Sequence, residues 1–532
     1  MPVVPARTIR ELNAAIDSRV GTQKFLKNAL DHIFPDNWSF MLGELAMYCF
    51  LILVLSGIYL TFFFDPSDSE VVYRGSYLPL HGQTMSLAYQ STLHLSLDVR
   101  AGLLFRQLHH WSADVFLAAI VAHLCRIFFT GAFRRPREIN WLIGVTLLIL
   151  SIFNGFSGYS LPGDLLSGAG LRIAYSIAES VPVVGNWIAT LFVGGQFPSD
   201  QLTHRLYIAH VFLVPLLIFG LLGLHLALIW RQKHTQFAGV GRSERRLVGS
   251  QLWPTYTARS LGLFAGTAGV LVLLAGLAQI NPIWLYGPYK PESMSSNSQP
   301  DWYVGWMEGA LRLFPGWRLH LFGYTVSEVF WPAVVLPLAT FAALYAYPFV
   351  ERRLTNDLVS HNLLDRPRDR PGRTAFGAGA LSFYMVLLIA GAQDTLAHIL
   401  GTTQPPVMLT LRGMTLAVPP LVALVTWKVC RDLSAAGRLP DTEPPQGPND
   451  AASPPPARYL PARARYETAD GAEAPAPASP LRRGGAALLG LSGAFAAGWF
   501  TRRSRTARRP NGAPGGGRDV GRDRAASQKR GR

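Results

Sequence analysis

Long apolar runs separated by short polar connections dominate the chain between residues 41 and 430. Each run is long enough to cross a hydrocarbon core of about 30 Å as a helix, and a soluble domain does not need so many of them. The pattern therefore predicts an all-α fold, a polytopic membrane protein with eight transmembrane helices. The expected spans are residues 41–63, 105–130, 141–160, 206–230, 259–280, 325–349, 375–399 and 407–430.

The two ends of the chain depart from this pattern. Residues 7–35 place apolar side chains among charges, which predicts an amphipathic interfacial helix within an N-terminal segment, 1–40. Residues 435–532 are rich in Pro, Ala, Gly and Arg, which predicts a disordered basic cytoplasmic tail. The short apolar stretch from Gly484 to Phe500 favours surface attachment, or no membrane role, over a ninth span. We expect 41–230 to form a four-helix bundle and 231–434 to supply the C-terminal helices.

Charge supports this organisation. Only 15% of the residues are charged, and the formal charge is +16. Residues 480–532 hold 12 Arg and 1 Lys against 2 Asp, which is +11, so most of the basic excess belongs to the tail and gives no reason to expect nucleic acid as a partner. The connections after the second, fourth and sixth spans carry 15 Lys and Arg, and the alternate connections carry 7. This asymmetry predicts a multi-pass protein of the cell membrane with both termini cytoplasmic.

Two of the expected spans each carry a pair of histidines. His109 and His123 are 14 residues apart, which brings the second side chain within about 40° of the first after a rise of about 21 Å. His210 and His225 are 15 residues apart, with an offset of about 60° and a rise of about 22 Å. Both spans run from outside to inside. We therefore pair His109 with His210 near the outer face, and His123 with His225 near the inner face.

These pairs predict two bis-histidine haems stacked across the membrane in the four-helix bundle. Ionisable groups are costly inside a span, and a single membrane histidine is more often a packing residue than a ligand. Four histidines in two matched pairs reverse that preference, because each pair can supply both axial imidazoles of one iron. His110 lies about 140° from His123 around the helix, so it faces away and stays unassigned.

Glycines and arginines near the histidines add to this prediction. A flat macrocycle that approaches a helix needs a missing side chain, although glycine is also common wherever membrane helices pack. Arg106 lies three residues before a histidine and Arg126 three residues after one, where a guanidinium could hold a haem propionate. Arg126 could equally be an ordinary positive anchor at the inner face. The glycines are Gly43 and Gly57 in the first span and Gly144 and Gly158 in the third, each pair 14 residues apart.

A second candidate site lies in the outer connection after the fifth span. Pro300, Asp301, Trp302 and Tyr303 follow one another there. Proline fixes the backbone, the two aromatic rings form an apolar wall, and this setting suits a carboxyl group that accepts a proton. The alternative is an interfacial aromatic belt beside a solvated aspartate.

The cysteines indicate no further cofactor. Cys49, Cys125 and Cys430 are scattered along the predicted spans, without a Cys-x-x-Cys-His sequence or the spacing of an iron-sulfur site. Covalent haem attachment and iron-sulfur ligation are therefore not expected in this chain.

In combination these motifs resemble cytochrome b of the quinol:cytochrome c oxidoreductase (cytochrome bc) complexes, over roughly residues 35–430. The motifs are the two histidine pairs, the two glycine pairs, Gly158-Tyr-Ser-Leu-Pro162 and Pro300-Asp-Trp-Tyr303. The last differs from the family's usual Pro-Glu-Trp-Tyr. Because several motifs agree along most of the chain, the resemblance is specific.

The resemblance implies a role for each candidate residue. His109 and His210 would ligate the outer, low-potential b haem, and His123 and His225 the inner, high-potential one. Arg106 and Arg126 match arginines that bind propionates. The stretch from Pro300 to Tyr303 matches the outer quinol-oxidation site, where Asp301 would take the quinol proton that Glu takes in relatives.

The resemblance also implies a reaction and partners. In a Q cycle, quinol oxidised outside sends one electron to a Rieske iron-sulfur protein and a cytochrome c subunit, and the other through the haems to quinone inside, which builds a proton gradient. The Pro-Asp-Trp-Tyr variant and the basic tail are similar to actinobacterial members. For those members the quinone is menaquinone and a terminal cytochrome c oxidase associates with the complex. A dimer of complexes, surrounded by membrane lipid, is also expected.

Some positions depart from the family pattern. Gly163 stands where a Trp usually follows Leu-Pro, and the 15-residue interval in the fourth span is similar to the chloroplast-type branch. Trp230 and Arg231 stand where the mitochondrial branch has its inner-site histidine, with Lys233 and His234 as neighbours. The inner quinone-reduction site is therefore not transferred to particular residues.

Two other functions fit parts of the pattern. A cytochrome b that anchors a dehydrogenase or hydrogenase would pass electrons to quinone without bifurcation, but eight spans and the stretch from Pro300 to Tyr303 argue against it. A transporter or scaffold with structural histidines would hold no haem. A count of b haems per polypeptide separates these alternatives.

Overall fold

Eight helices of the described residues are long and apolar enough to cross a membrane, which confirms the eight predicted spans. The structure is a computed structural model that describes residues 17–19, 27, 29–293, 299–321, 323–436 and 465–467. The chain divides into two units, Met1–Ala476 and Pro477–Arg532, and every described residue belongs to the first. The spans are Trp38–Thr61 (with α3, Leu42–Thr61), Gly102–Thr130 (α5), Glu138–Tyr159 (α6), Leu202–Gln232 (α9, Leu202–Ile208, to α10, Val214–Gln232), Leu252–Leu277 (with α11, Thr257–Leu277), Trp331–Thr355 (with α14, Leu336–Thr355), Pro371–Gly391 (α15) and Gln404–Ala436 (α17).

The fifth to eighth spans differ most from their predicted bounds. The fifth begins at Leu252 instead of residue 259, and the eighth ends at Ala436 instead of residue 430. The sixth begins six residues later than expected, because the strands β6 (Leu319–Leu321) and β7 (Tyr324–Val326) form a hairpin before it. The seventh begins at Pro371 and ends at Gly391, so the predicted range 375–399 joined two helices. The second of these is α16 (Gln393–Ile399).

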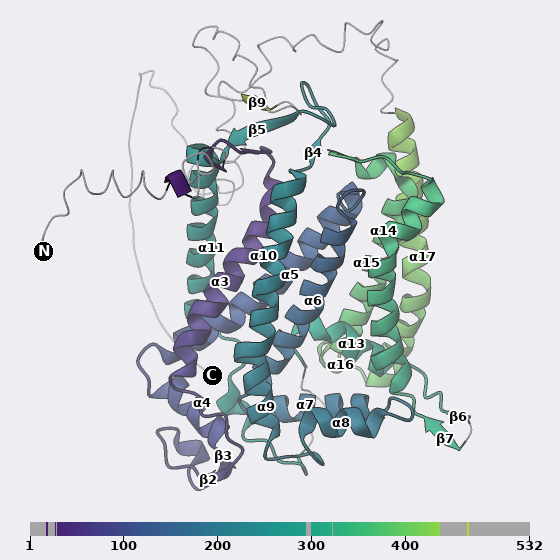
Figure 1. Cartoon of the computed structure of the whole chain (residues 1–532). Helices are drawn as coiled ribbons and strands as arrows, with labels where there is room; N and C mark the ends of the chain where they lie inside the picture. The colour runs from purple at the N-terminus through teal and green to yellow at the C-terminus, as the bar shows by residue number, and fades with distance from the viewer. Residues whose placement is uncertain are drawn as a thin grey trace, which may run out of the picture. The chain divides into compact units, whose positions relative to one another are not determined.

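Short helices and hairpins gather at one end of the spans, as Figure 1 shows. All of them except α16, which was predicted as part of the seventh span, belong to the connections predicted to lie outside, and we call this the outer end. The opposite, inner end carries β4 and β5. The outer elements are the hairpin of β2 (Glu70–Val72) and β3 (Thr84–Ser86), α4 (Leu87–Leu97), α7 (Leu165–Glu179), α8 (Gly185–Val193), α12 (Ile283–Tyr286), α13 (Trp302–Leu313) and α16.

At the inner end, short strands tie distant parts of the chain together. β1 (Ile33–Phe34) pairs antiparallel with β5 (Leu247–Gln251), and β4 (Gln236–Phe237) pairs in parallel with β8 (Leu363–Leu364). The amphipathic helix predicted for residues 7–35 lies largely outside the described residues, and the strand β1 shows that any such helix ends before Ile33. Most of the predicted tail, including 484–500, lies outside them as well. Within it, β9 (Arg465–Glu467) pairs with β5.

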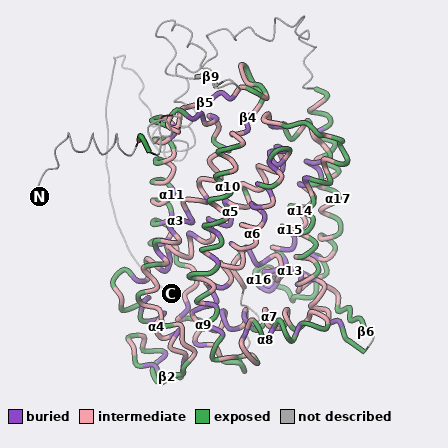
Figure 2. Tube along the Cα trace, in the orientation of Figure 1, coloured by how far each residue is buried: buried purple, intermediate pink, exposed green. Residues whose placement is uncertain are grey.

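Apolar packing holds α3, α5, α6 and α10 together, with α11 against α3 and α5. The buried side chains of this core include Phe50, Leu117, Leu148 and Ile218. Many large apolar residues of the spans are exposed instead, which suits helices surrounded by lipid tails. Figure 2 shows exposed residues, in green, along the helices. The separate group of α13, α15 and α17 packs around its own core.

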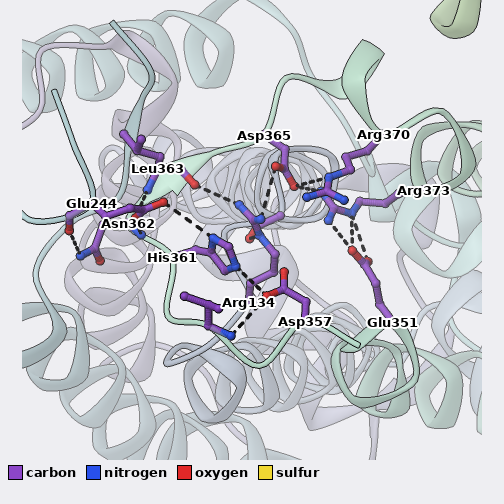
Figure 3. A network of polar contacts seen from close by, with 12 residues as sticks. Arg134, Glu244, Glu351, Asp357, His361, Asn362, Leu363, Asp365, Arg370 and Arg373 are labelled. Carbon is purple, nitrogen blue, oxygen red and sulfur yellow. Dashed lines mark hydrogen bonds and ion pairs between the residues drawn. The ribbon is translucent and has the colours of Figure 1, made fainter. Parts of the chain in front are cut away.

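A network of ion pairs fastens these two groups of helices at the inner end (Figure 3). Arg373, at the start of α15, is buried and bonds to Asp365 at 2.8 Å and to Glu351 of α14. Asp365 also pairs at 3.3 Å with Arg134, which follows α5. Because breaking a buried pair leaves a charge without compensation, this network fixes the bundle relative to the C-terminal helices.

Candidate functional site

The four predicted ligands lie on the two expected helices of the bundle. His109 and His123 are on α5, His225 is on α10, and His210 is in the turn that joins α9 to α10. The rings of His109 and His210 lie next to each other in an edge arrangement, with centroids 6.1 Å apart and an interplanar angle of 73°. This separation leaves room for one metal ion between the two rings. His123 and His225 lie close enough to interact electrostatically.

A π-helical turn explains the 15-residue interval on the fourth span. Residues Ala209–Leu213 form this turn, and the amide of Val214 donates to the carbonyl of Ala209, five residues back. Pro215 follows and has no amide hydrogen for the regular ladder. A π turn takes up one extra residue, so His225 returns toward the azimuth that a 14-residue interval gives on a regular helix. The sequence-based offset of about 60° is therefore too large.

Each glycine of the first span lies against one histidine of α5. A Cβ on Gly43 would lie 3.2 Å from Cε1 of His123, and a Cβ on Gly57 would lie 3.2 Å from Cε1 of His109. These distances are tighter than most Cβ contacts, so the missing side chains keep space open beside the imidazoles. A flat group bound to these rings would need this space.

Gly144 and Gly158 of the third span take the corresponding positions opposite α10. A Cβ on Gly158 would lie 2.4 Å from Cε1 of His210, which no unshifted ring could tolerate. A Cβ on Gly144 would lie 3.8 Å from Cε1 of His225, which is an ordinary contact. The glycine pairs thus face the histidine pairs at both levels, and the constraint is most severe at Gly158.

Hydrogen bonds orient the outer histidines. Nδ1 of His210 lies 2.9 Å from the carbonyl oxygen of Asn154, and Nδ1 of His109 lies 2.9 Å from Oγ of Ser56. A carbonyl oxygen can only accept, so Nδ1 of His210 carries the hydrogen. Nε2 of that ring then keeps its lone pair for a metal, which is the usual arrangement around metal-bound histidine.

Two arginines have buried guanidinium nitrogens that reach no hydrogen-bond partner among the described residues. Arg106 donates from Nη2 to the carbonyl of Asn281 at 3.1 Å, but its Nε reaches no hydrogen-bond partner among the described residues. Arg126 lies over the ring of Phe40, 4.1 Å from its centroid, and its Nε and Nη2 also reach no such partner in the described part of the chain. Buried donors of this kind call for an acceptor, and a carboxylate of a bound group would supply one at each level.

These features together fit haem. The imidazole pairs, the bare glycine backbones and the incompletely bonded arginines lie at two matched levels of one bundle. Within the described residues, no group of three or more His, Cys, Asp or Glu side chains could hold a metal ion by itself. An iron whose macrocycle supplies its equatorial ligands needs only the two histidines.

A cavity of about 500 Å³ joins the outer histidine pair to the second candidate site. It extends between α3, α5, α6 and α10 and reaches the start of α13. His109 and His210 line it together with Asp301 and Tyr303. Side chains of the outer histidine pair and of the Pro300–Tyr303 stretch therefore line the same cavity.

Asp301 is held by two side chains. Nε2 of His110 lies 3.0 Å from both carboxylate oxygens, and the hydroxyl of Tyr303 donates to Oδ2 at 2.8 Å. Burial and the neighbouring Asp301 raise the pKa of Tyr303 well above its ordinary value, so this hydroxyl keeps its hydrogen and donates it. The arrangement is a partly buried carboxylate with a fixed orientation, rather than a solvated aspartate at the rim.

His110 is the functional neighbour that the sequence left unassigned. The helical angle that turns it away from His123 directs it toward α13, where it meets Asp301 across 191 positions of sequence. The sequence did contain a signal for this contact. A histidine that lies inside a span and ligates no metal needs a polar partner.

Trp302 and Pro300, the other two residues of the Pro300–Tyr303 stretch, have different surroundings. The Trp302 side chain hydrogen-bonds to Asp114 of α5. Pro300 lines a second cavity of about 570 Å³ at the outer end, together with Glu308 and Arg312 of α13. The four residues of the motif therefore do not share one pocket, and only Asp301 and Tyr303 reach the cavity of the histidines.

Known proteins match the chain along most of its length. A family model described as Cytochrome b(N-terminal)/b6/petB matches residues 114–288. The cytochrome bc1 complex cytochrome b subunit of Mycobacterium tuberculosis is 50% identical over 80% of this chain and 77% of its own length. The chain belongs to the cytochrome b family of bc1 complexes. Subunits of the same name from Corynebacterium diphtheriae and Streptomyces coelicolor are 46% and 48% identical, over 81% and 78% of this cytochrome b and 79% and 76% of their own lengths.

A solved structure has the same fold. A chain of a hyperthermophilic respiratory Complex III aligns with a TM-score of 0.58 and 20% identity, over 78% of this cytochrome b and 99% of its own length. Family and fold together make the protein an integral membrane subunit that carries b-type haem and transfers electrons in a respiratory complex.

The space beside His210 gives a first prediction. We expect Gly158→Ala to displace the His210 ring and to lower the occupancy of the outer haem, because the new Cβ would lie 2.4 Å from Cε1. Gly220→Ala on α10 is the matched control, since a Cβ there meets nothing within 4 Å. Haem difference spectra of the two purified variants test this expectation. Equal haem content in both would show that the outer level tolerates a side chain at position 158.

Proposed function

We propose that this cytochrome b oxidises quinol at its outer end and sends electrons across the membrane to quinone at its inner end. The substrate is menaquinol, and the reaction is a Q cycle that builds a proton gradient. His109 and His210 hold a low-potential haem, and His123 and His225 hold a high-potential haem. When bound, the two haems supply reversible one-electron carriers. This makes the chain the quinol-oxidising subunit of a quinol–cytochrome c reductase.

The observation that carries this proposal is the shared cavity at the outer end. His109, His210, Asp301 and Tyr303 all line it. A quinol that enters this space meets a carboxylate and, behind it, the residues proposed to hold the outer haem. Proton acceptance and electron transfer can then occur at one bound molecule.

The chain's own residues perform the proton chemistry. Asp301 accepts a quinol hydroxyl proton, while His110 and Tyr303 hold its two oxygens toward the cavity. A general base of this kind contributes about 10²–10⁴-fold to a rate when it is fixed within hydrogen-bond reach of its substrate. The apolar walls of the cavity exclude water from the reacting hydroxyl.

The reaction requires acceptors and a membrane orientation. We propose that a Rieske iron-sulfur protein and a cytochrome c subunit take one electron of each quinol, and that a terminal cytochrome c oxidase associates with a dimer of these complexes. The proposed location is the cell membrane with both termini in the cytoplasm. The outer end, with Asp301, then releases protons on the side opposite the basic connections.

Electron bifurcation is the test of this function. The intact complex is mixed without oxygen with a soluble menaquinol analogue, and the b haems and the high-potential acceptor are followed together by their spectra. We expect one b haem and one acceptor to be reduced for each quinol in the first turnover. Delivery of both electrons to the acceptor, with the b haems left oxidised, would contradict the proposal.

A further inference from the structure

The outer end of the bundle holds a buried carboxyl group that the proton chemistry of Asp301 does not use. Asp164 lies in the connection after α6 and is 0% exposed. Its Oδ2 accepts the amides of Leu166 and Ser167 at 3.1 and 3.4 Å, and its Oδ1 accepts the Ser167 hydroxyl at 2.5 Å. Asp164 is therefore the N-cap of α7. Asparagine or serine would cap the helix as well, so capping alone does not account for a buried carboxyl group.

Backbone contacts fix Asp164 against the connection that follows the fifth span. Asp164 forms an antiparallel bridge with Pro288, and the amide of Leu165 donates to the carbonyl of Gly287 at 3.0 Å. The carboxyl group therefore has a set position relative to the segment 281–288, which includes α12.

The outer end of α5 holds the same connection from another side chain set. Arg106 donates to the carbonyl of Asn281 at 3.1 Å, and its guanidinium carbon lies 5.8 Å from the ring centroid of Trp284. Gln107 is 1% exposed and bonds to both backbone groups of Ile280, donating to the carbonyl at 2.7 Å and accepting the amide at 2.9 Å. One short connection thus contacts both the start of α7, with its carboxyl group, and the part of α5 that carries Arg106.

Asp164 and Arg106 interact electrostatically in this region, and Tyr286 of α12 interacts with both. Burial raises the pKa of Asp164, while the hydrogen bonds from Ser167 and Leu166 favour its charged form. The positive charge of Arg106 favours that form too. An ionised carboxyl group beside a guanidinium in a buried region compensates its charge strongly, because the local dielectric constant is low. Arg106 then brings little net charge to the outer histidine level.

The arginine at the inner histidine level has a different charged neighbour. Arg126 interacts electrostatically with a second arginine, Arg137, which precedes α6. The charged neighbours of Arg106 and Arg126 therefore differ in sign. The two levels are alike in their histidines, and this difference in charge distinguishes their surroundings.

We propose that Asp164 is a positioning residue that keeps the outer haem at low potential by compensating the charge of Arg106. The inference rests on the proposed function, in which Arg106 lies beside the outer haem. Reduction adds one electron to a haem, and a fixed negative charge nearby makes that addition less favourable. A low outer potential favours electron transfer to the inner haem, which must proceed against a membrane potential that is positive outside.

The experiment is a redox titration of the purified complex with Asp164→Asn. Asparagine has a similar size and is also a good N-cap, so this variant removes the charge and keeps the start of α7. We expect the equilibrium constant for reduction of the lower-potential b haem to rise by about tenfold, which is about 59 mV for a one-electron step. The higher-potential step and the number of haems should be unchanged.

Asp68→Asn is the matched control. Asp68 also lies at the outer end and accepts the amide and the hydroxyl of Thr203 at 3.2 and 2.6 Å, but it does not belong to the group of Asp164, Arg106 and Tyr286. Both steps should keep their wild-type potentials in this variant. An equal rise of the lower step would overturn the inference, because any carboxyl group of the outer end would then have the same effect.

Asp164→Ser supplies a second uncharged N-cap if the asparagine variant fails to assemble. An unchanged lower step in either variant, with two b haems retained, would overturn the inference. Loss of the outer haem from both variants would overturn it as well, since the carboxyl group would then be required for assembly. If the wild-type complex holds fewer than two b haems per chain, the proposed function fails instead.

Discussion

The His109→Leu variant is expected to contain one b haem per chain instead of two. His109 and His210 lie next to each other with ring centroids 6.1 Å apart, and leucine removes one of the two proposed axial ligands at the outer level. Leucine has a similar volume to histidine and is well tolerated in a span, so the helix should remain. Haemochrome spectra of the purified complex, which distinguish b from c haem, give the count directly.

His110→Asn is the matched control for this change. It alters the adjacent histidine of the same helix but leaves the imidazoles of His109 and His210 in place, so both haems should be retained. The account predicts that His109→Leu loses the low-potential component. A loss confined to the high-potential component would mean that the outer and inner levels are assigned the wrong way round.

The second large effect is expected at Asp301. Asp301→Asn should slow quinol oxidation by about 100-fold or more, because asparagine cannot take up the quinol proton. Both b haems should remain, since Asp301 contacts His110 and Tyr303 rather than the proposed ligands. Steady-state reduction of cytochrome c by a quinol analogue measures the rate, and a difference spectrum measures the haems.

Asp301→Glu is the conservative partner of that variant. Glutamate is the family's usual residue at this position and keeps the carboxyl group, so we expect most of the activity to remain. If Asp301→Asn turns over as fast as the wild type, the aspartate is only a polar residue of the outer rim. Loss of activity together with loss of haem would place its role in assembly.

The spans were predictable because each is a long apolar run, and hydropathy depends only on local sequence. The residues at which the spans begin and end were harder to predict. The boundary before Trp331 depends on the β6–β7 hairpin, and the break at Ala392 separates α15 from α16, although no long polar segment marks either. The short outer helices, such as α13, were missed because an amphipathic segment of 12 residues gives a weak signal beside the spans.

The histidine levels were predictable because regular helices have a fixed angle per residue. The π turn at Ala209–Leu213 was not, since it depends on how Pro215 changes the hydrogen-bond ladder. The contact between His110 and Asp301 depends on how α13 folds back onto α5, which no local pattern specifies.

A redox titration of the purified wild-type complex, with the haem content measured on the same sample, tests the central claim most directly. The claim is that two histidine pairs hold two b haems at different depths and in different surroundings. We predict two b haems per chain that titrate as two separate one-electron steps, the lower of which is absent in His109→Leu. Fewer than two b haems per chain would contradict the account.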